Sequence, residues 1–279
     1  VEAEVGVQET GTGSHTMFQR VLATALGLER ERVAIRYVST AHLPTDMGVG
    51  GQRVTVSGVQ GSVSAAAAFA EQVAREAAEL LGVAPEQVEV KPGGVAAASN
   101  GRQITFAELA ARGVTAETLC EVPETPAHDA GATNYCVQVA QVGVDVETGQ
   151  VFVYDFVSAH DVAEIIEPVS HRGQIEGGIA MGLGFALSED LRIVDGQVTA
   201  THFGDYKLPT TSDMPPLEVV LLEGGIGVGP RNVKSIGEMG NVPAAAVISN
   251  AVSDALGVCM DSLPLTAEKV YAAAHSQRT

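Results

Sequence analysis

Positively charged residues are scarce in this chain. Its 279 residues include 16 Lys and Arg against 34 Asp and Glu, which gives a formal net charge of −18. Such a chain repels the phosphates of nucleic acids, and no basic stripe compensates locally. We therefore expect no nucleic-acid partner.

Cysteines are also few. The three that occur, Cys120, Cys136 and Cys259, lie far apart and form no CxxC pair. This spacing argues against a zinc or iron–sulfur site within the chain, and we expect no protein-ligated metal. Scattered buried thiols of a cytoplasmic protein are the interpretation we adopt.

No apolar run approaches the ~20 residues that a membrane-spanning helix needs, the alanine run at Ala65–Ala68 included. The first residues, Val1–Glu4, are acidic and lead into no apolar stretch, so we expect neither a signal peptide nor a membrane partner. The chain begins without Met and in the middle of an apparent strand. We take this as a sign of a fragment, a processed chain or one subunit of a larger assembly.

Apolar periodicity, with glycines and prolines as boundaries, predicts an irregular alternation of helices and strands. Expected strands are 4–8, 33–38, 88–90, 137–146, 151–158 and 217–222, and expected helices are 17–26, 62–81, 106–111, 174–188, 242–256 and 266–274. Gly27 and Gly82 are expected helix C-caps. The order lacks the strict βαβ period, so the predicted class is α+β with two mixed lobes, 1–130 and 131–279.

Four glycine-rich segments stand out, at residues 11–16, 48–53, 173–184 and 237–240. Backbone N–H groups in glycine turns form concave nests for anions, and small residues allow close contact with a flat ligand. Together they predict a phosphate-bearing cofactor. The first segment lacks the lysine of a P-loop, and Gly182-Leu183-Gly184 lies inside a helical pattern, so neither an ATPase nor a dinucleotide site is indicated.

Glu238 lies between Gly237 and Gly240, just before the helix expected at 242–256. Its surroundings lack bulky side chains, so a ligand could approach the carboxylate closely. The residues by themselves are equally compatible with a helix-capping acid in a tight turn.

Several segments together resemble the C-terminal half of the molybdopterin-binding subunit of the xanthine dehydrogenase–aldehyde oxidase family, the molybdenum hydroxylases. The matching segments keep the family's order and are 9–19 (its Gly-Gln-Gly-x-x-Thr motif), 50–53, 145–149, 173–178 with 182–184, 205–210, the Gly-Glu pair at 237–238, and 263–266. The resemblance covers residues 5 to 271.

The resemblance implies that Glu238 is a general base that takes the proton from a molybdenum-bound hydroxide. The reaction would hydroxylate a carbon of an aldehyde or N-heterocycle with water-derived oxygen. It also implies cofactor contacts at Gly11, Thr12, Gly13, Gly50, Gly51, Gln52, Arg53, Gln174 and Gly237. The cofactor would be molybdenum–molybdopterin, with the cytosine dinucleotide form as a variant.

Simpler interpretations of these residues remain open. Gln174 is also compatible with a solvent-facing helix position, and Arg53, the expected phosphate partner, with a surface loop. His15 is expected at a helix start without catalytic duty. The resemblance places Asp161 in a structural hairpin turn, so the pair His160-Asp161 receives no acid/base role.

The chain departs from the family pattern at three positions: Thr12 replaces a cofactor-binding glutamine, Glu167 an asparagine and Met181 a glutamine. It also lacks the N-terminal molybdopterin-binding half. The implied partners are that half or subunit, iron–sulfur subunits, a FAD subunit as an optional further component, and a small-molecule substrate.

Three hypotheses follow. The chain is the C-terminal domain or split medium subunit of a molybdenum hydroxylase, complete only with its partner; or it is a cofactor-free relative that serves as a binding or assembly module; or it is a stand-alone enzyme that uses Glu238 with a second acid. The third is the weakest, because the sequence offers no convincing second acid.

Overall fold

The structure is a computed structural model that describes residues 1–43, 48–119 and 133–276. These residues form two compact units. Unit 1 comprises the described part of Val1–Ala132 with Glu164–Glu167 and Ile226–Ser235, and unit 2 comprises the described part of Thr133–Ala163, Pro168–Gly225 and Ile236–Thr279. The predicted boundary between the lobes, at residues 130 and 131, lies outside the described residues, as does Cys120.

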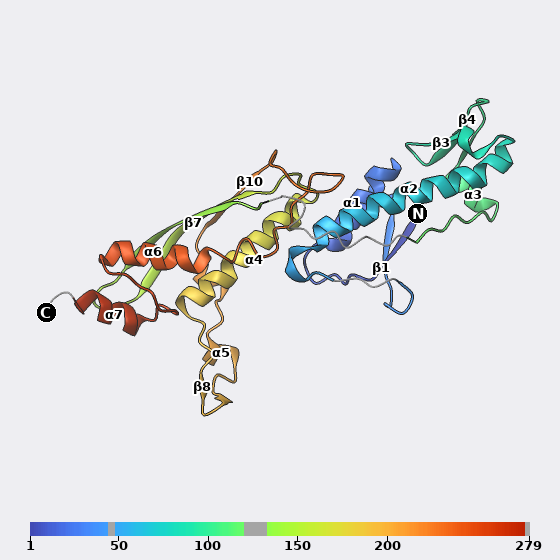
Figure 1. Cartoon of the computed structure of the whole chain (residues 1–279). Helices are drawn as coiled ribbons and strands as arrows, with labels where there is room; N and C mark the ends of the chain where they lie inside the picture. The colour runs from blue at the N-terminus through green and yellow to red at the C-terminus, as the bar shows by residue number, and fades with distance from the viewer. Residues whose placement is uncertain (44–47, 120–132, 277–279) are drawn as a thin grey trace. The chain divides into compact units, whose positions relative to one another are not determined.

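Unit 1 is built around two helices that lie side by side, α1 (Ser14–Leu26) and the long α2 (Val54–Leu81) (Figure 1). They run in the same direction, because residues near the start of each meet and residues further along each meet in turn. The predicted C-caps are confirmed: Gly27 and Gly82 both adopt the left-handed conformation that ends a helix at glycine.

Two small sheets complete unit 1. Strands β1 (Glu2–Val5) and β2 (Ala34–Tyr37) pair in parallel. An antiparallel sheet of β3 (Val88–Lys91), β4 (Val95–Ala98) and β5 (Gln103–Thr105), followed by α3 (Phe106–Ala111), packs against the second half of α2. Short 3₁₀ turns at Arg30–Arg32, Gly50–Gln52 and Pro85–Gln87 connect these elements.

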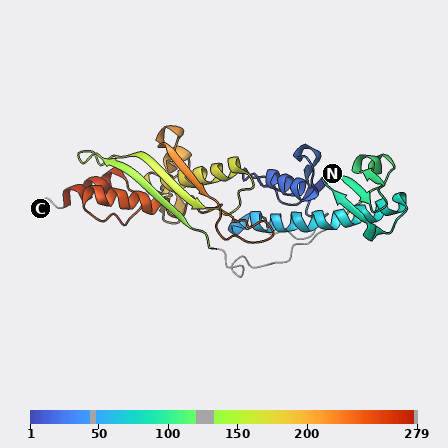
Figure 2. The ribbon, with the colours of Figure 1, turned by 90° about the horizontal axis from the view of Figure 1, so that it is seen from above.

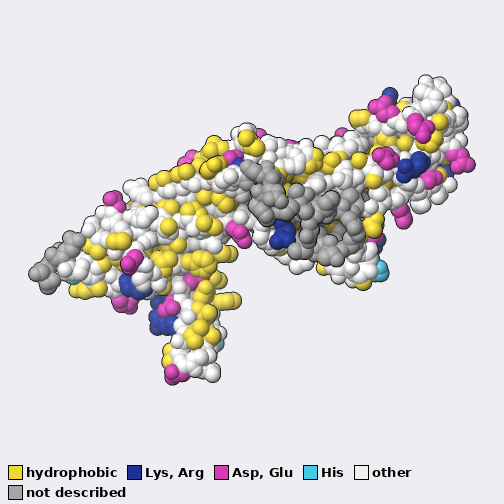
Figure 3. All heavy atoms as spheres, in the orientation of Figure 1, with side chains coloured by type: hydrophobic (Ala, Val, Ile, Leu, Met, Phe, Trp, Pro, Cys, Tyr) yellow, Lys and Arg dark blue, Asp and Glu magenta, His cyan; other side chains and the backbone are white. Residues whose placement is uncertain are grey.

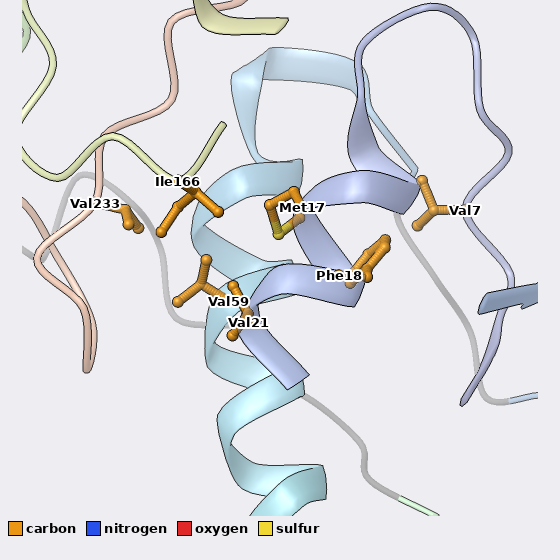
Figure 4. Close-up of a cluster of buried hydrophobic side chains, with 7 residues drawn as sticks. All are labelled: Val7, Met17, Phe18, Val21, Val59, Ile166 and Val233. Atoms are coloured by element: carbon orange, nitrogen blue, oxygen red, sulfur yellow. The ribbon is translucent and has the colours of Figure 1, made fainter. Parts of the chain in front are cut away.

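The core of unit 1 includes residues from distant parts of the sequence. In Figure 4, Met17, Phe18 and Val21 of α1 lie beside Val59 of α2, and Ile166 and Val233 approach the same helix pair. Because Ile166 and Val233 belong to the two late segments of unit 1, these segments are held to it by apolar burial.

Unit 2 contains one three-stranded sheet in the order β10-β7-β6. The hairpin of β6 (Cys136–Val144) and β7 (Val151–Asp161) is antiparallel, and β10 (Leu217–Leu222) pairs with β7 in parallel. This confirms the predicted hairpin.

Three helices accompany this sheet: α4 (Pro168–Leu187), α6 (Ala244–Leu256) and α7 (Ala267–Ser276). Contacts join α6 to β6 and α4 to both α6 and β10, while α7 lies against the β6–β7 turn, where Gly149 meets the backbone of Ala267. Figure 2 shows the sheet and these helices from above. The short elements β8 (Ile193–Val194), β9 (Gln197–Val198), α5 (Phe203–Tyr206) and the 3₁₀ turn Thr211–Asp213 follow α4.

Several predicted bounds were wrong. Helix α2 begins eight residues before the expected start at 62, α4 begins six residues before 174, and β1 ends at Val5 rather than at 8. In α2 and α4 the glycines near the start suggested a loop, but tertiary contacts keep these turns helical. The sequence analysis also missed β4, β5, β8, β9 and α5. The prediction of buried thiols was wrong for Cys259, which is exposed, whereas Cys136 is half-buried.

On the face shown in Figure 3, Lys and Arg side chains occur in small separate groups, and hydrophobic side chains gather over β7 and β10. Within the described ranges, no helix is long and apolar enough to cross a membrane. The same ranges contain no group of three or more His, Cys, Asp or Glu side chains arranged to hold a metal ion.

Candidate functional site

The first glycine-rich loop, just before α1, is wrapped around the carboxylate of Glu9. Oε1 of Glu9 accepts hydrogen bonds from the backbone N–H groups of Gly11 and Gly13, both at 2.9 Å, and Oε2 accepts from Ser14 Oγ at 3.2 Å and His15 N at 3.0 Å. Partial burial acts to raise the pKa of Glu9, but these hydrogen bonds outweigh it and hold the pKa below its ordinary value. The loop that was expected to bind an anionic ligand therefore binds the carboxylate of Glu9.

Thr12 lies between the two glycines that bind Glu9. Its Oγ1 atom is buried, and among the described residues it has no hydrogen-bond partner. A buried hydroxyl without a partner costs free energy, on the order of 1–3 kcal/mol, so it marks a place where a polar ligand atom would be favoured. Gly11 leaves open space where a Cβ would stand. The side chain of Thr12 thus remains available on this loop, and the space beside Gly11 is open.

The second predicted loop, Gly50 to Arg53, leads directly into α2. Arg53 donates from Nε to the carbonyl oxygen of Gly50 at 2.8 Å, which clips its guanidinium to its own loop. Gly51 and Gln52 both have positive φ, at 65° and 58°, and Gly50 has open space beside it. A positive φ costs free energy at Gln52 that it would not cost at a glycine. The conformation of this tight turn therefore does not depend on its glycines alone.

Unit 1 brings these two loops to the same end of its helix pair. A Cβ on Gly58, in the second turn of α2, would lie 2.7 Å from Met17 Cε and from Phe18 Cε1 in the first turns of α1. The helices are therefore in close contact near their starts, where the loops enter them. Residues 11–13 and 50–53, predicted to bind one cofactor, are neighbours for this reason.

Glu167, which replaces a family asparagine, is nearly buried and forms an ion pair with Arg20 of α1, with 2.6 Å between Oε2 and Nε. Both residues lie in unit 1, next to a hollow of about 470 Å³ lined by Arg20, Arg30 and Arg231 with apolar side chains. Each of these arginines is close to a glutamate, Arg30 to Glu31 and Arg231 to Glu164. Because the charges balance, the hollow is no anion site.

In unit 2, Glu238 lies on a turn that precedes α6, and its side chain is exposed. Its backbone carbonyl accepts from the N–H groups of Asn241 at 3.1 Å and Val242 at 3.2 Å, while Met239 N donates to Ile236 O at 3.1 Å. The carboxylate is thus presented to solvent from an ordered turn. Helix α6 starts at Ala244, and its N-cap residue, Pro243, makes no side-chain capping hydrogen bond.

Glycines of α4 and of this turn bring the two into close contact. A Cβ on Gly240 would stand 2.6 Å from the carbonyl oxygen of Ile175, and a Cβ on Gly178 would stand 3.0 Å from Asn241 N. Gln174 directly precedes Ile175 and is partly exposed. In this contact of α4 with the turn, Gln174 is therefore one position from a contacting residue, Ile175, and Glu238 is two positions from another, Gly240.

A buried polar group beneath this turn was missed by the sequence analysis. Gln138 of β6 donates from Nε2 to Gly240 O at 2.9 Å and to Ser158 Oγ at 3.1 Å, and Ser158 Oγ lies 2.6 Å from His160 Nε2. All three side chains are buried, and burial lowers the pKa of His160. The available signal was the strand pattern, because these polar residues occupy positions that alternate with exposed ones.

His160 and Asp161 lie at the end of strand β7, not in the hairpin turn where the resemblance placed the aspartate. A Cβ on Gly225 would meet Asp161 Oδ1 at 2.1 Å, so this side chain is packed against backbone. His15 lies in the first turn of α1, where Nε2 contacts Val7 O at 2.7 Å.

The family model of the molybdopterin cofactor-binding domain matches residues 1–215. Among curated proteins, the chain is 30% identical over 282 residues to the gamma subunit of the 6-hydroxypseudooxynicotine dehydrogenase complex of Paenarthrobacter nicotinovorans, covering 97% of this chain and 36% of that protein. It is 30% identical over 275 residues to the aldehyde oxidoreductase molybdenum-binding subunit PaoC of Escherichia coli (strain K12), covering 97% of this chain and 36% of that subunit.

Among solved structures, quinoline 2-oxidoreductase from Pseudomonas putida 86 matches with a TM-score of 0.82 and 26% identity, over 99% of this chain and 36% of that one. The Cu,Mo-CO dehydrogenase matches with a TM-score of 0.81 and 23% identity, over 99% of this chain and 36% of that one, and shows the fold alone. The mixed helix-and-sheet class predicted from the sequence is thereby confirmed. The chain spans about 36% of the length of these relatives.

Proposed function

The chain belongs to the molybdopterin cofactor-binding domain family, with the molybdenum-binding subunits of xanthine dehydrogenases and aldehyde oxidoreductases, and on this premise we propose that it is the part of a molybdenum hydroxylase that supplies the general base. The observation that carries the proposal is Glu238, an exposed carboxylate on a turn with fixed backbone hydrogen bonds between two glycines. The family match supports the cofactor, and this geometry supports the base.

When bound, molybdenum–molybdopterin supplies the two-electron oxidation of the substrate carbon. Glu238 accepts a proton at its carboxylate from the water-derived oxygen that is transferred to an aldehyde or N-heterocycle carbon. Gly237 has no side chain and is exposed, so an aromatic substrate or a flat cofactor can approach the carboxylate closely from this side. Gln174 of α4 offers an amide that both donates and accepts hydrogen bonds to the amide-like edges of a pterin.

Unit 1 is proposed to contact the cofactor through the loops 11–13 and 50–53. The buried, unpartnered hydroxyl of Thr12 fits a polar cofactor atom, and the open space at Gly11 and Gly50 fits close approach of its flat or phosphate-bearing parts. The N–H groups of Gly11 and Gly13 are already bound by Glu9, so the contact made by these glycines is backbone approach and not amide donation. Arg53, Gly51 and Gln52 would serve a phosphate, as in a cytosine dinucleotide form of the cofactor.

The missing part of the molybdenum-binding subunit is the first partner that we propose, because the relatives are almost three times as long as this chain. Electrons leaving the cofactor need a carrier, so iron–sulfur subunits are the second, and a FAD subunit is an optional third. A reducing, cytoplasmic location is proposed from the free thiols of Cys136 and Cys259.

The test is co-expression of the chain with the remainder of a molybdenum-binding subunit, followed by metal analysis and turnover assays with aldehydes and N-heterocycles. Glu238→Gln should lower kcat by about 10²- to 10⁴-fold while the molybdenum content stays unchanged. The matched control is Glu147→Gln, in the exposed β6–β7 turn of the same unit, which should keep normal turnover.

Two outcomes would contradict the proposal. Normal turnover by Glu238→Gln would show that this carboxylate is not the base. A folded, assembled complex without molybdenum and without turnover would favour the alternative, a cofactor-free relative that serves in binding or assembly.

A further inference from the structure

A chain of buried hydrogen bonds joins the sheet of unit 2 to the turn that carries Glu238, and we infer that Gln138 acts through it as a positioning residue for Glu238. The inference rests on the proposed function and adds a second residue to it. Gln138 does not reach the reacting atoms; it holds the backbone from which the base projects.

Three buried side chains make up this series of hydrogen bonds. Gln138 uses both hydrogens of Nε2, one toward Gly240 O at 2.9 Å and one toward Ser158 Oγ at 3.1 Å. Ser158 Oγ lies 2.6 Å from His160 Nε2, and a hydroxyl fits either tautomer of the ring. The burial of His160, with 1% of its surface exposed, lowers its pKa and favours the neutral ring.

The bond to Gly240 acts on Glu238 through a single peptide group. The carbonyl of Gly240 and the N–H of Asn241 belong to the same planar unit, so they cannot rotate separately. The carbonyl accepts from Gln138, and the N–H donates to the backbone oxygen of Glu238 at 3.1 Å. Rotating this peptide would break both bonds at once, so Gln138 fixes the carbonyl that sets the direction of the Glu238 turn.

Helix α4 packs closely against the same peptide group. A Cβ on Gly240 would stand 2.6 Å from the carbonyl oxygen of Ile175, so the turn is already packed against the α4 backbone. Packing can hold the turn against α4, but it does not select the orientation of the Gly240 carbonyl. The directional bond from Gln138 supplies that selection.

The buried face of this sheet explains why a glutamine here has a specific role. The register pairs Gln138 with Ser158, between the pair of Cys136 with His160 on one side and the pair of Ala140 with the buried Phe156 on the other. Burying an amide costs free energy unless its hydrogen bonds are made, so burying an apolar side chain at such a position would cost less free energy. Gln138 makes both of its donor bonds, to the turn and to Ser158, while its Oε1 has no partner among the described residues.

The test compares Gln138→Met, which keeps length but removes the donor, with Gln141→Met, an exposed position of the same strand. Hydrogen–deuterium exchange of the 279-residue chain reports on the segment 237–243. In Gln138→Met the amides of Asn241 and Val242 should exchange about five- to tenfold faster, while Gln141→Met should match the wild type. In the completed complex, Gln138→Met should lower kcat about 10- to 100-fold with KM unchanged, because the base is misdirected while substrate contacts persist.

Unchanged exchange in Gln138→Met overturns the inference, and so does faster exchange with unchanged kcat. If Gln138→Met fails to fold, Ser158→Ala is the second variant: it leaves the donor in place but removes its other acceptor, and faster exchange of the same amides is expected. Failure of the proposed function is distinguishable, because it appears as normal turnover in Glu238→Gln, whatever Gln138→Met does.

Discussion

Oε1 of Glu9 lies 2.9 Å from the backbone nitrogen of Gly13, at the start of α1. Gly13 is the N-cap of this helix and has no side chain with which to cap it. The carboxylate of Glu9 therefore takes the place of a capping side chain, and it also neutralises the positive end of the helix dipole. The Gly-x-Gly motif that suggested a phosphate nest is first of all a helix start.

Glu9→Gln should destabilise the chain. The two carboxylate oxygens of Glu9 accept hydrogen bonds from four donors, whereas a glutamine amide has only one oxygen that can accept. Carboxylates at helix N-termini contribute about 0.3–1 kcal/mol, and we expect a loss of that order at pH 7 in urea denaturation. The folded-state pKa of Glu9 lies below its ordinary value of 4.5, so its contribution is present above pH 4.5 and disappears as the pH falls through the folded-state value. The difference between wild type and variant should accordingly vanish in strong acid.

The control for Glu9 is Glu29→Gln, an exposed glutamate that caps no helix through its side chain. It should leave the unfolding free energy unchanged within about 0.5 kcal/mol. A Glu9→Gln variant as stable as this control at pH 7 would refute the capping role.

His160 should make stability fall in mild acid. Because burial lowers its folded-state pKa, the unfolded chain binds a proton near pH 6.5 while the folded chain does not. The unfolding free energy should therefore decrease as the pH drops from 6.5 through the folded-state pKa, by at most about 1.4 kcal/mol per pH unit, and level off below it.

Denaturation curves of wild type and His160→Gln across this pH range measure that slope. The variant should show a shallower slope, and His202→Gln, at an exposed position, should keep the wild-type slope. Identical slopes in wild type and His160→Gln would mean that the folded chain binds this proton as readily as the unfolded chain, against the expected effect of burial on the pKa of His160.

Two glycines of α4 should respond to alanine with opposite signs. A Cβ on Gly182 would stand 2.4 Å from Ala244 Cβ of α6, whereas a Cβ on Gly177 would meet nothing within 4 Å. Gly182→Ala should cost about 1–3 kcal/mol by forcing α4 and α6 apart. Gly177→Ala should gain about 0.5–1 kcal/mol, because alanine is the better helix former. Thermal melting of both variants checks the signs, and a stabilised Gly182→Ala would contradict the close contact of these helices.

Elements with local signals were predicted well. Helix α3 has the predicted bounds because Thr105 and Glu108 form a reciprocal capping box, with Thr105 Oγ1 accepting from Glu108 N at 3.1 Å and Glu108 Oε2 accepting from Thr105 N at 2.8 Å. Strand β10 also keeps its predicted bounds. In contrast, the first eight residues of α2 are rich in valine and glycine, and they are helical where Gly58 packs against Met17 and Phe18. A contact with another helix cannot be read from the residues of α2 alone.

The residues of the candidate site likewise fall into those with a local sequence signal and those without one. Glu238, Gln174 and the two glycine loops were predicted as site residues because each belongs to a short motif in a fixed order. Gln138 and Ser158 were missed, because their role depends on a partner, Gly240, that is 102 residues from Gln138. The role of Glu9 was also missed, although it is local, because a carboxylate two residues before a glycine turn looks like any surface acid until the turn folds onto it.

By itself the sequence determined the family, the acidic character, the glycine C-caps and the identity of the candidate base, since these depend on residue types at short spacings. Only the tertiary structure decided which groups the glycine loops bind, and which buried side chain donates to the turn that carries Glu238. It also assigned residues 164–167 and 226–235 to unit 1, where Ile166 and Val233 enter its core. The physical reason is that packing and buried hydrogen bonds join residues by distance in space, and chain order carries no record of that distance.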